Sequence, residues 1–171
     1  MRVVTGSLRG RKLVAPDAGA TRPTTDRVRE AVFNALTSLD IIIDARVVDL
    51  YAGSGAMGIE ALSRGATHCT FVERDRGALS AIHANIGALG LTGVTRVVAG
   101  DAAVYAARVD ADIAFVDPPY DFDAWDDLLT SIAAGFVVAE SGREVPAPSG
   151  WEQTRVKRYG RTWVTFLTRT G

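Results

Sequence analysis

The sequence of 171 residues predicts an α/β fold with a doubly wound, mostly parallel sheet. Three observations support this prediction. Short apolar runs that suit buried strands alternate with stretches of helical periodicity between residues 46 and 139. A glycine-rich loop follows the first of these strands and opens a helix. Finally, 47% hydrophobic and 23% charged residues are close to the averages of globular proteins, and this length is typical of one domain.

The expected strands and helices follow one another in regular order. Strands are expected at residues 47–50, 69–72, 94–98, 113–116 and 136–139, and helices at 56–64, 79–89 and 123–134. The last part of the chain differs from this pattern. Residues 153–157 and 162–167 flank a glycine turn and predict a β-hairpin, so we expect an antiparallel C-terminal edge of the sheet.

The first 40 residues are interpreted as an N-terminal extension. Residues 2–14 contain two short apolar runs on either side of a basic, glycine-containing segment, and they predict a small β-hairpin. Residues 16–25 predict a loop. Apolar residues at helical spacing from Val28 to Leu39 predict an amphipathic helix that begins near residue 25 or 26. We therefore divide the chain into an extension, residues 1–40, and one main domain, residues 41–171.

Cysteine and histidine content and hydropathy argue against several classes of protein. Cys69 is the single cysteine, which excludes an internal disulfide and a multi-cysteine zinc site. Only two histidines are present, so we expect no metal centre. No apolar run approaches the ~18 residues of a membrane span, and the first residues do not resemble a signal peptide. We therefore expect a cytoplasmic protein that makes no contact with membranes.

The net charge of -1 conceals an uneven distribution along the chain. Residues 1–30 carry seven basic and three acidic side chains, and residues 143–171 carry six and two. The part between them carries six basic and fifteen acidic side chains. Two basic ends suggest an anionic partner that meets them. Ordinary solvated surface explains the same distribution equally well.

A glycine-rich loop predicts a cofactor site. Residues 49–58 read DLYAGSGAMG and place three glycines in the spacing G-x-G-x-x-G. Glu73 ends the next strand, 20 residues after Gly53, where a carboxylate can accept hydrogen bonds from ribose hydroxyls. Dinucleotides and S-adenosylmethionine both use such a loop. Asp49 precedes the loop and would repel a pyrophosphate, but it would suit an ammonium group, which favours S-adenosylmethionine.

The predicted cofactor site extends over three strand ends. Asp101 follows the third strand and is placed to meet the adenine end of a nucleoside; the alternative is that it caps a helix. The complete set of expected cofactor-binding residues is Asp49, Tyr51, Ala52, Gly53, Gly55, Glu73, Arg74, Asp101 and Ala102.

A second motif, Asp117-Pro118-Pro119-Tyr120, follows the fourth strand. The two prolines remove two backbone donors and keep the preceding residue extended. The Asp117 carboxylate and the Pro118 carbonyl can then accept both hydrogens of an exocyclic amino group, while Tyr120 stacks on a splayed-out base. These hydrogen bonds favour a pyramidal nitrogen with its lone pair directed at a methyl donor. We therefore predict methyl transfer to an amino group, with these four residues as the catalytic set.

Both motifs together resemble the Rossmann-like S-adenosylmethionine-dependent methyltransferases of the amino-group type. More narrowly, the sequence resembles the bacterial 16S ribosomal RNA guanine-N2 methyltransferase family, the RsmD type. The run RPTTDRVRE at residues 22–30 narrows the resemblance, because D-P-P-Y is shared with DNA and protein methyltransferases. The resemblance implies a seven-stranded sheet, S-adenosylmethionine as cofactor, and N2 methylation of one guanine of 16S rRNA within a small ribosomal subunit or its precursor.

Basic side chains near the ends of the chain are candidates for phosphate contacts, which position RNA without reading its sequence. The expected RNA-binding residues are Arg9, Arg11, Lys12, Arg22, Arg27 and Arg29, and four basic residues of the C-terminal hairpin are further candidates. Three other functions stay open: DNA adenine-N6 methylation, nicotinamide-dependent oxidation and reduction, and RNA binding without catalysis. The short chain argues against the first, and Asp49 and the D-P-P-Y motif argue against the other two. We expect a monomer.

Overall fold

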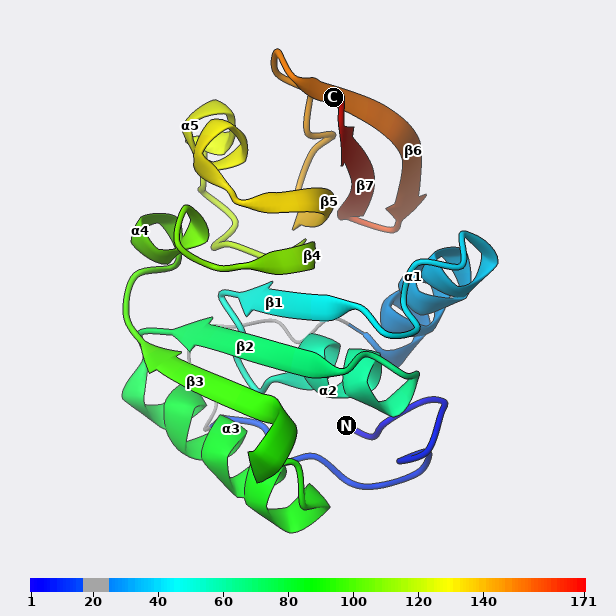
Figure 1. The fold of residues 1–171 in the computed structure, drawn as a ribbon, viewed down its shortest axis with the longest axis vertical. Helices are drawn as coiled ribbons and strands as arrows, with labels where there is room; N and C mark the ends of the chain where they lie inside the picture. Colours follow the sequence, from blue (N-terminus) through cyan, green and yellow to red (C-terminus); the bar gives the residue numbers. More distant parts are fainter. Residues whose placement is uncertain (17–24) are drawn as a thin grey trace.

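The computed structural model describes residues 1–16 and 25–171, and a seven-stranded sheet runs through its centre (Figure 1). The strand order is β3-β2-β1-β4-β5-β7-β6. The strands are β1 (Arg46–Leu50), β2 (His68–Glu73), β3 (Thr95–Ala99), β4 (Ala111–Val116), β5 (Ala134–Ser141), β6 (Trp151–Tyr159) and β7 (Thr162–Arg169). Strands β1 to β5 are parallel, and β7 pairs antiparallel with both β5 and β6. The predicted fold class is confirmed.

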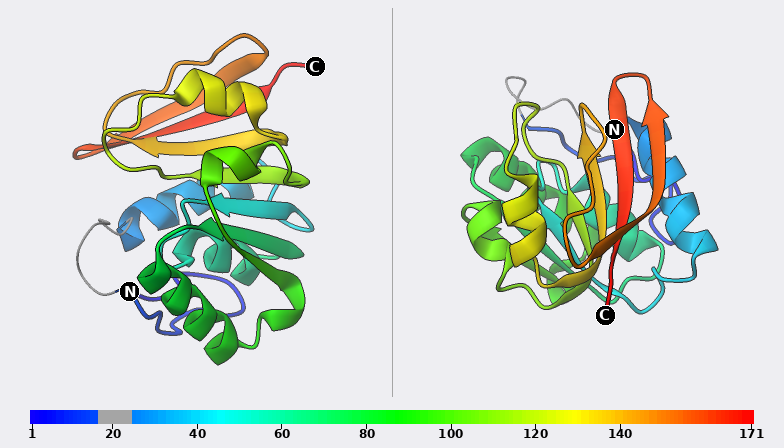
Figure 2. Two further views of the ribbon diagram at one scale, coloured as in Figure 1. Left: turned by 90° about the vertical axis from the view of Figure 1, so that its left-hand side faces the viewer. Right: turned by 90° about the horizontal axis from the view of Figure 1, so that it is seen from above.

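Helices cover both faces of the sheet, which explains why its central strands are apolar on both sides. The buried hydrophobic residues form two clusters, one on each face of the sheet. Cluster 1, which includes Val32, Ile59 and Ile82, lies under three helices, α1 (Asp26–Ser38), α2 (Ala56–Ser63) and α3 (Arg76–Leu89). Cluster 2, which includes Ala106, Leu128 and Val137, lies on the other face, under α4 (Ala102–Ala106) and α5 (Trp125–Ser131). In the right-hand view of Figure 2, α1 and α5 lie on opposite sides of the strands.

Several element boundaries differ from those expected by up to three residues, and the short helix α4 is not among the expected helices. Two of the boundary differences have a clear local cause. The helix expected over residues 123–134 is limited to α5, because Ile132 adopts an extended conformation after the last turn. The third strand begins at Thr95, because a short 3-10 helix, η1 (Thr92–Val94), occupies the residues before it. Strongly periodic segments fix the existence of an element better than its ends, which depend on local caps.

The predicted N-terminal β-hairpin forms only in part. Among the described residues before α1, a single antiparallel bridge joins Arg2 and Lys12, and no ladder of paired strands forms. Gly6 and Gly10 adopt left-handed conformations that reverse the chain direction. A small two-stranded ribbon is marginally stable in isolation. We call this segment the N-terminal loop (residues 1–14). Three backbone hydrogen bonds join its two arms, from Val3 N to Arg11 O, Gly10 N to Val3 O and Leu13 N to Met1 O. Side chains of the helices beneath it bond to further backbone groups of the loop.

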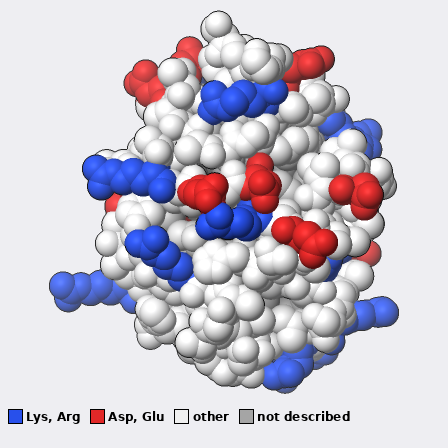
Figure 3. Space-filling model, viewed as in Figure 1, with Lys and Arg blue, Asp and Glu red and all other residues white. Residues whose placement is uncertain are grey.

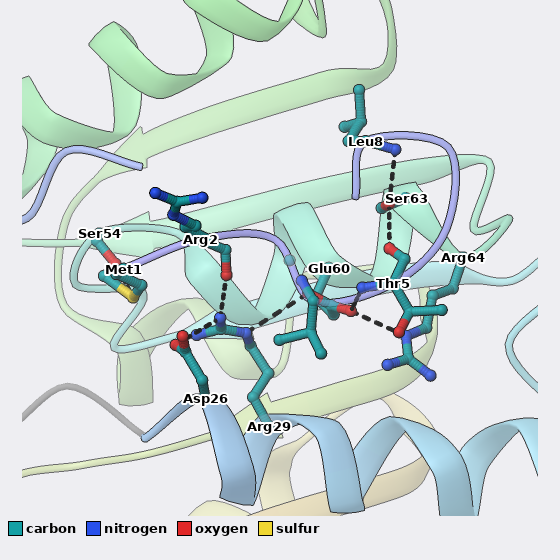
Figure 4. A network of polar contacts seen from close by, with 12 residues as sticks. Met1, Arg2, Thr5, Leu8, Asp26, Arg29, Ser54, Glu60, Ser63 and Arg64 are labelled. Carbon is teal, nitrogen blue, oxygen red and sulfur yellow. Dashed lines mark hydrogen bonds and ion pairs between the residues drawn. The ribbon is translucent and has the colours of Figure 1, made fainter. Parts of the chain in front are cut away.

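The buried Glu60 of α2 anchors the N-terminal loop (Figure 4). Its carboxylate accepts hydrogen bonds from the backbone N–H groups of Val4 and Thr5, at 2.8 and 2.9 Å. The same carboxylate accepts one from Arg64 Nε at 2.9 Å and forms an ion pair with Arg29 Nε at 3.5 Å. One buried acid thus joins the loop to α1 and α2.

The extension shares its core with the sheet. Val3 and Leu13 of the N-terminal loop are buried in cluster 1, and the ring of Phe33 in α1 packs against Phe115 of β4, with 5.3 Å between ring centroids. Thr25 caps α1 by accepting a hydrogen bond from Val28 N, as the sequence predicts. The described part of residues 1–40 therefore packs as an integral layer on the sheet.

Charged groups of both signs are interspersed on the face seen in Figure 3, where no large area of one sign stands out. Among the helices of residues 1–16 and 25–171, none is long and apolar enough to cross a membrane.

Candidate active site

The predicted site residues converge where β1 to β5 end, which we call the carboxyl edge of the sheet. Strand β1 lies between β2 and β4, and Leu50 pairs with Val72 on one side and with Val116 on the other. The loops after β1 and β4 therefore leave the sheet at neighbouring points. Strand order reverses beside β1, and such switch points are the usual ligand-binding crevices of open α/β sheets.

The glycine-rich loop after β1 needs each of its three glycines. Gly53 and Gly55 adopt left-handed conformations with φ of 57° and 79°. At Gly58 the requirement is space, because a Cβ there would lie 2.4 Å from Cys69 Sγ and from the ring of Phe71. The third glycine thus lets α2 approach β2 closely. At Gly53 no heavy atom would lie within 4 Å of a Cβ, so the backbone borders open space on that side.

Glu73 at the end of β2 lies directly against this loop. Its Oε2 accepts a hydrogen bond from Gly53 N at 2.8 Å. Its Oε1 accepts hydrogen bonds from the backbone N–H groups of Arg74 and Asp75, at 2.8 and 2.9 Å. Three backbone donors hold the carboxylate in place while it remains half-buried. The structure therefore brings the predicted acid and the predicted glycine loop together.

Asp49 supports the loop from below. It is only 3% exposed, and its Oδ2 accepts a hydrogen bond from Gly58 N in the first turn of α2 at 2.9 Å. Burial raises the pKa of Asp49 to about 8; the hydrogen bond from Gly58 opposes this rise and the nearby charge of Glu73 adds to it. The described contact is thus structural, and the predicted contact with an ammonium group stays a prediction.

Asp101 caps α4, which is one of the two roles that the sequence left open. Its side chain accepts a hydrogen bond from Val104 N at 3.1 Å, and Arg74 lies 3.9 Å away. Its side chain is 49% exposed, so a further contact is sterically open. Tyr51, a non-glycine residue with φ of 61°, packs its ring edge-on against Phe122.

The D-P-P-Y motif leaves the sheet directly after β4. Tyr120 is 83% exposed, yet its ring lies over the backbone of Gly142, which follows β5. A Cβ at Gly142 would lie 2.4 Å from Tyr120 Cε2. A cavity of about 270 Å³ lies beside the motif, and its lining includes Pro118, Pro119, Tyr120, Phe122, Ser141, Gly142 and Arg143. The aromatic ring thus borders a space between the ends of β4 and β5.

The predicted RNA-binding residues lie in different places. Arg29 is fully buried, and its guanidinium contacts Asp26, Glu60 and the carbonyl oxygen of Arg2. The predicted phosphate contact of Arg29 is therefore wrong, because this cation neutralises a buried acid and has no surface to offer. Arg22 lies outside the described residues.

Arg9 and Arg11 are exposed but lie far from the D-P-P-Y motif. The loop that carries them bonds to Ser63 at the end of α2, and Arg11 donates to the carbonyl of Ala88 at the end of α3. Both helices end where the strands begin, which we call the amino edge. Lys12 and Arg27 are also exposed. Arg27 lies in the first turn of α1, which is directed toward the carboxyl edge.

Sequence reasoning missed residues 141–143. Gly142 supports the ring of Tyr120, and Arg143 lines the same cavity. The only available signal was their position directly after a parallel strand, since ligands of such sheets bind at strand carboxyl ends. No residue-type pattern marked them.

Known proteins show the same combination of fold and motifs. A family model described as "Conserved hypothetical protein 95" matches residues 1–168. "Putative rRNA methyltransferase YlbH" of Bacillus subtilis (strain 168) is 41% identical over 186 residues, which is 100% of both chains. "Ribosomal RNA small subunit methyltransferase D" of Escherichia coli (strain K12) is 45% identical over 122 residues, 70% of this chain and 60% of that protein.

A solved structure agrees over nearly the whole chain. The structure described as "Putative methyltransferase yhhF from Escherichia coli" superposes with a TM-score of 0.86 at 36% identity, and the match covers 99% of this chain and 97% of that one. Family model, relatives and structure point the same way, and the chain belongs to the conserved hypothetical protein 95 family, the RsmD family of methyltransferases that its motifs resemble.

Proposed function

We propose that this protein transfers a methyl group from S-adenosylmethionine to the N2 amino group of a guanine in 16S rRNA. The observation that carries the proposal is the neighbouring position of two loops at the carboxyl edge. The glycine loop with Glu73 follows β1 and β2, and the D-P-P-Y motif follows the adjacent β4. The name of the Escherichia coli relative, a small-subunit rRNA methyltransferase, supports the choice of substrate.

The residues of the glycine loop fit S-adenosylmethionine. The open space beside Gly53 lets a ligand approach the backbone, and the carboxylate of Glu73 borders that space. In this proposal Glu73 accepts hydrogen bonds from the ribose hydroxyls, and Asp101 and Ala102 lie beside the adenine. Arg74 lies next to both the ribose and the adenine. The cofactor supplies a methyl group that is already activated by the sulfonium. The protein therefore has to position the methyl donor and the acceptor nitrogen and to exclude water from between them.

The D-P-P-Y motif then orients the acceptor. The Asp117 carboxylate and the Pro118 carbonyl each accept one hydrogen of the guanine amino group, and Pro119 keeps the loop rigid. Tyr120 stacks on the base, which is turned out of its RNA strand. The nitrogen lone pair thereby points toward the methyl donor. Asp117, which accepts one N–H, is also the group in place to take the proton that the nitrogen releases.

The exposed basic residues supply phosphate contacts in this proposal. Arg27 serves the RNA near the carboxyl edge, whereas Arg9, Arg11 and Lys12 serve a more distant part of the substrate. Small ribosomal subunits are cytoplasmic, so we place the protein in the cytoplasm and expect it to act there as a monomer.

Methyl transfer from labelled S-adenosylmethionine tests this proposal. Small ribosomal subunits from cells lacking the protein and free 16S rRNA are compared as acceptors, and the product is digested to nucleosides. We expect the label in N2-methylguanosine, with more label from the particle. DNA is included as a third acceptor. Label in N6-methyl-2′-deoxyadenosine from the DNA, or no label in rRNA, would contradict the proposal.

A variant of Asp117 links the activity to the motif. Asp117→Ala removes the acceptor and should abolish transfer, with the Kd for S-adenosylmethionine changed less than about threefold. Asp117→Asn keeps an acceptor oxygen without the charge and should retain more activity than Asp117→Ala. A normal rate in Asp117→Ala would show that the amino-group mechanism is incorrect.

A further inference from the structure

The C-terminal hairpin reaches the same edge of the sheet as the D-P-P-Y motif. Strand β7 runs antiparallel to β5, and Trp163 near its start pairs with Ser141 at the end of β5. In the hairpin itself, Arg158 pairs with Trp163. The turn between β6 and β7, which we call the hairpin tip (residues 158–163), therefore lies at the carboxyl edge, beside the loop that follows β5.

Arg143 lies after the end of β5, beside the motif. It follows β5 by two residues, and its backbone N–H donates to Ser141 Oγ at 3.2 Å. Its exposed side chain lines the cavity that Pro118, Pro119 and Tyr120 border. A cation is therefore present at the rim of the space where the proposed function puts the target base.

The hairpin tip adds two more exposed cations. Arg158 is held in place, because its Nε donates to the carbonyl of Gly160 at 2.9 Å and its guanidinium lies 5.5 Å from the centre of the Trp163 ring. Such contacts reduce the side-chain entropy lost on binding. Arg161 lies in the turn itself and is exposed.

Acidic groups border the same space as Arg143. Asp121 and Asp123 line the cavity beside the motif together with Arg143, and a second cavity is lined by Asp123, Asp126, Asp127, Arg143 and Glu144. The segment before and within the start of α5 carries Asp121, Asp123, Asp126 and Asp127, and all four are exposed. Phosphates would be repelled there. Residues 153–171 contain no acidic side chain, so the hairpin tip is the direction in which charge favours an RNA strand that leaves the cavity.

We infer that Arg143, Arg158 and Arg161 bind the phosphates of the nucleotides next to the methylated one. This inference rests on the proposed function. An enzyme that turns a base out of its strand must hold the backbone on at least one side of it, and phosphate contacts do this without reading sequence. Arg9 and Arg11, which lie at the amino edge, cannot hold these nearest phosphates.

The triple variant Arg143→Gln, Arg158→Gln, Arg161→Gln tests the inference. Steady-state methylation of small ribosomal subunits should show KM raised about tenfold, with kcat and the Kd for S-adenosylmethionine within twofold of wild type. Each lost phosphate contact should lower the slope of log KM against log salt concentration by about 0.7–0.9. Arg108→Gln removes an exposed cation between α4 and the start of β4, at the amino edge, and should match wild type.

The outcomes separate this inference from the proposed function. If the wild-type protein methylates rRNA and the triple variant has the same KM and the same salt slope, the inference is overturned and the proposed function is intact. Wild type without activity on rRNA would contradict the proposed function. In that case filter binding of labelled 16S rRNA decides the inference: weaker, less salt-dependent binding by the triple variant supports it, and equal binding overturns it.

Discussion

Gly142 shows how one residue without a side chain can position an aromatic ring of a neighbouring loop. The ring of Tyr120 occupies the place where any other residue at 142 would have its Cβ. Tyr120 is otherwise largely exposed, so little else restrains it. The position of the Tyr120 ring in the proposed site thus depends on the absence of a Cβ at residue 142.

Gly142→Ala should therefore displace the Tyr120 ring and lower kcat for methyl transfer roughly tenfold, because a misplacement of about 1 Å can reduce rate up to a hundredfold. Affinity for S-adenosylmethionine should not change, since the glycine loop is separate. Gly135→Ala in β5 is the matched control, because its nearest contact would be an ordinary 3.9 Å to the Asp112 carbonyl. Equal losses in both variants would argue against the support role.

Asp49 makes stability depend on pH. Its pKa is about 8 in the folded protein, against 3.8 when exposed. Between these values the folded state binds the extra proton, so this group stabilises the fold at low pH and loses that contribution as pH rises toward 8. The effect of one such group is at most about 1.4 kcal/mol per pH unit.

Asp49→Asn removes this titration and keeps an acceptor for Gly58 N. We expect the free energy of unfolding of wild type to fall relative to that of Asp49→Asn as pH increases from 5 to 8. Urea denaturation at several pH values measures the difference, and the exposed Asp126→Asn is the control. A difference that does not change with pH would show that Asp49 titrates normally.

At the scale of elements, the N-terminal loop depends on a carboxylate of another element. Glu60 supplies acceptors for two of the loop's backbone N–H groups. It also neutralises two arginines, Arg29 of α1 and Arg64, which directly follows α2. The short apolar runs of residues 2–14 indicate a hairpin by themselves. The N–H groups of Val4 and Thr5 instead donate to Glu60 of α2, which lies more than 50 residues further along the chain. No local pattern could reveal that partner.

Glu60→Gln should destabilise the protein by about 3–5 kcal/mol, because the buried guanidinium of Arg64 loses its counter-charge and that of Arg29 keeps only the exposed Asp26. Urea denaturation measures the decrease in the free energy of unfolding. Limited proteolysis should cleave the N-terminal loop of the variant earlier than that of the wild type. Glu30→Gln, on the exposed side of α1, should cost less than about 0.5 kcal/mol. Similar values for both variants would mean that the buried network contributes little.

The whole molecule combines two loops from adjacent strands of one sheet, and cofactor binding should stabilise that sheet globally. At a concentration of S-adenosylmethionine 100 times its Kd, a binding site confers about 2.7 kcal/mol. For a chain of this size the expected rise in Tm is roughly 5–10 °C. NAD at the same concentration should produce none, and Glu73→Ala should weaken the effect. A rise with NAD instead would favour the oxidoreductase alternative.

The sequence by itself determined the alternating strands and helices, the glycine loop with its acid, and the D-P-P-Y motif. These are local signals, because periodicity, turn residues and motif spacing lie within short windows. Only the tertiary structure decided that Arg29 is buried and that Tyr120 rests on Gly142. It also decided that β7, rather than β6, pairs with β5. That pairing brings the hairpin tip to the carboxyl edge. Because β7 runs antiparallel to β5, it begins where β5 ends. Such choices depend on which distant surfaces bury each other best, and no window of sequence contains both partners.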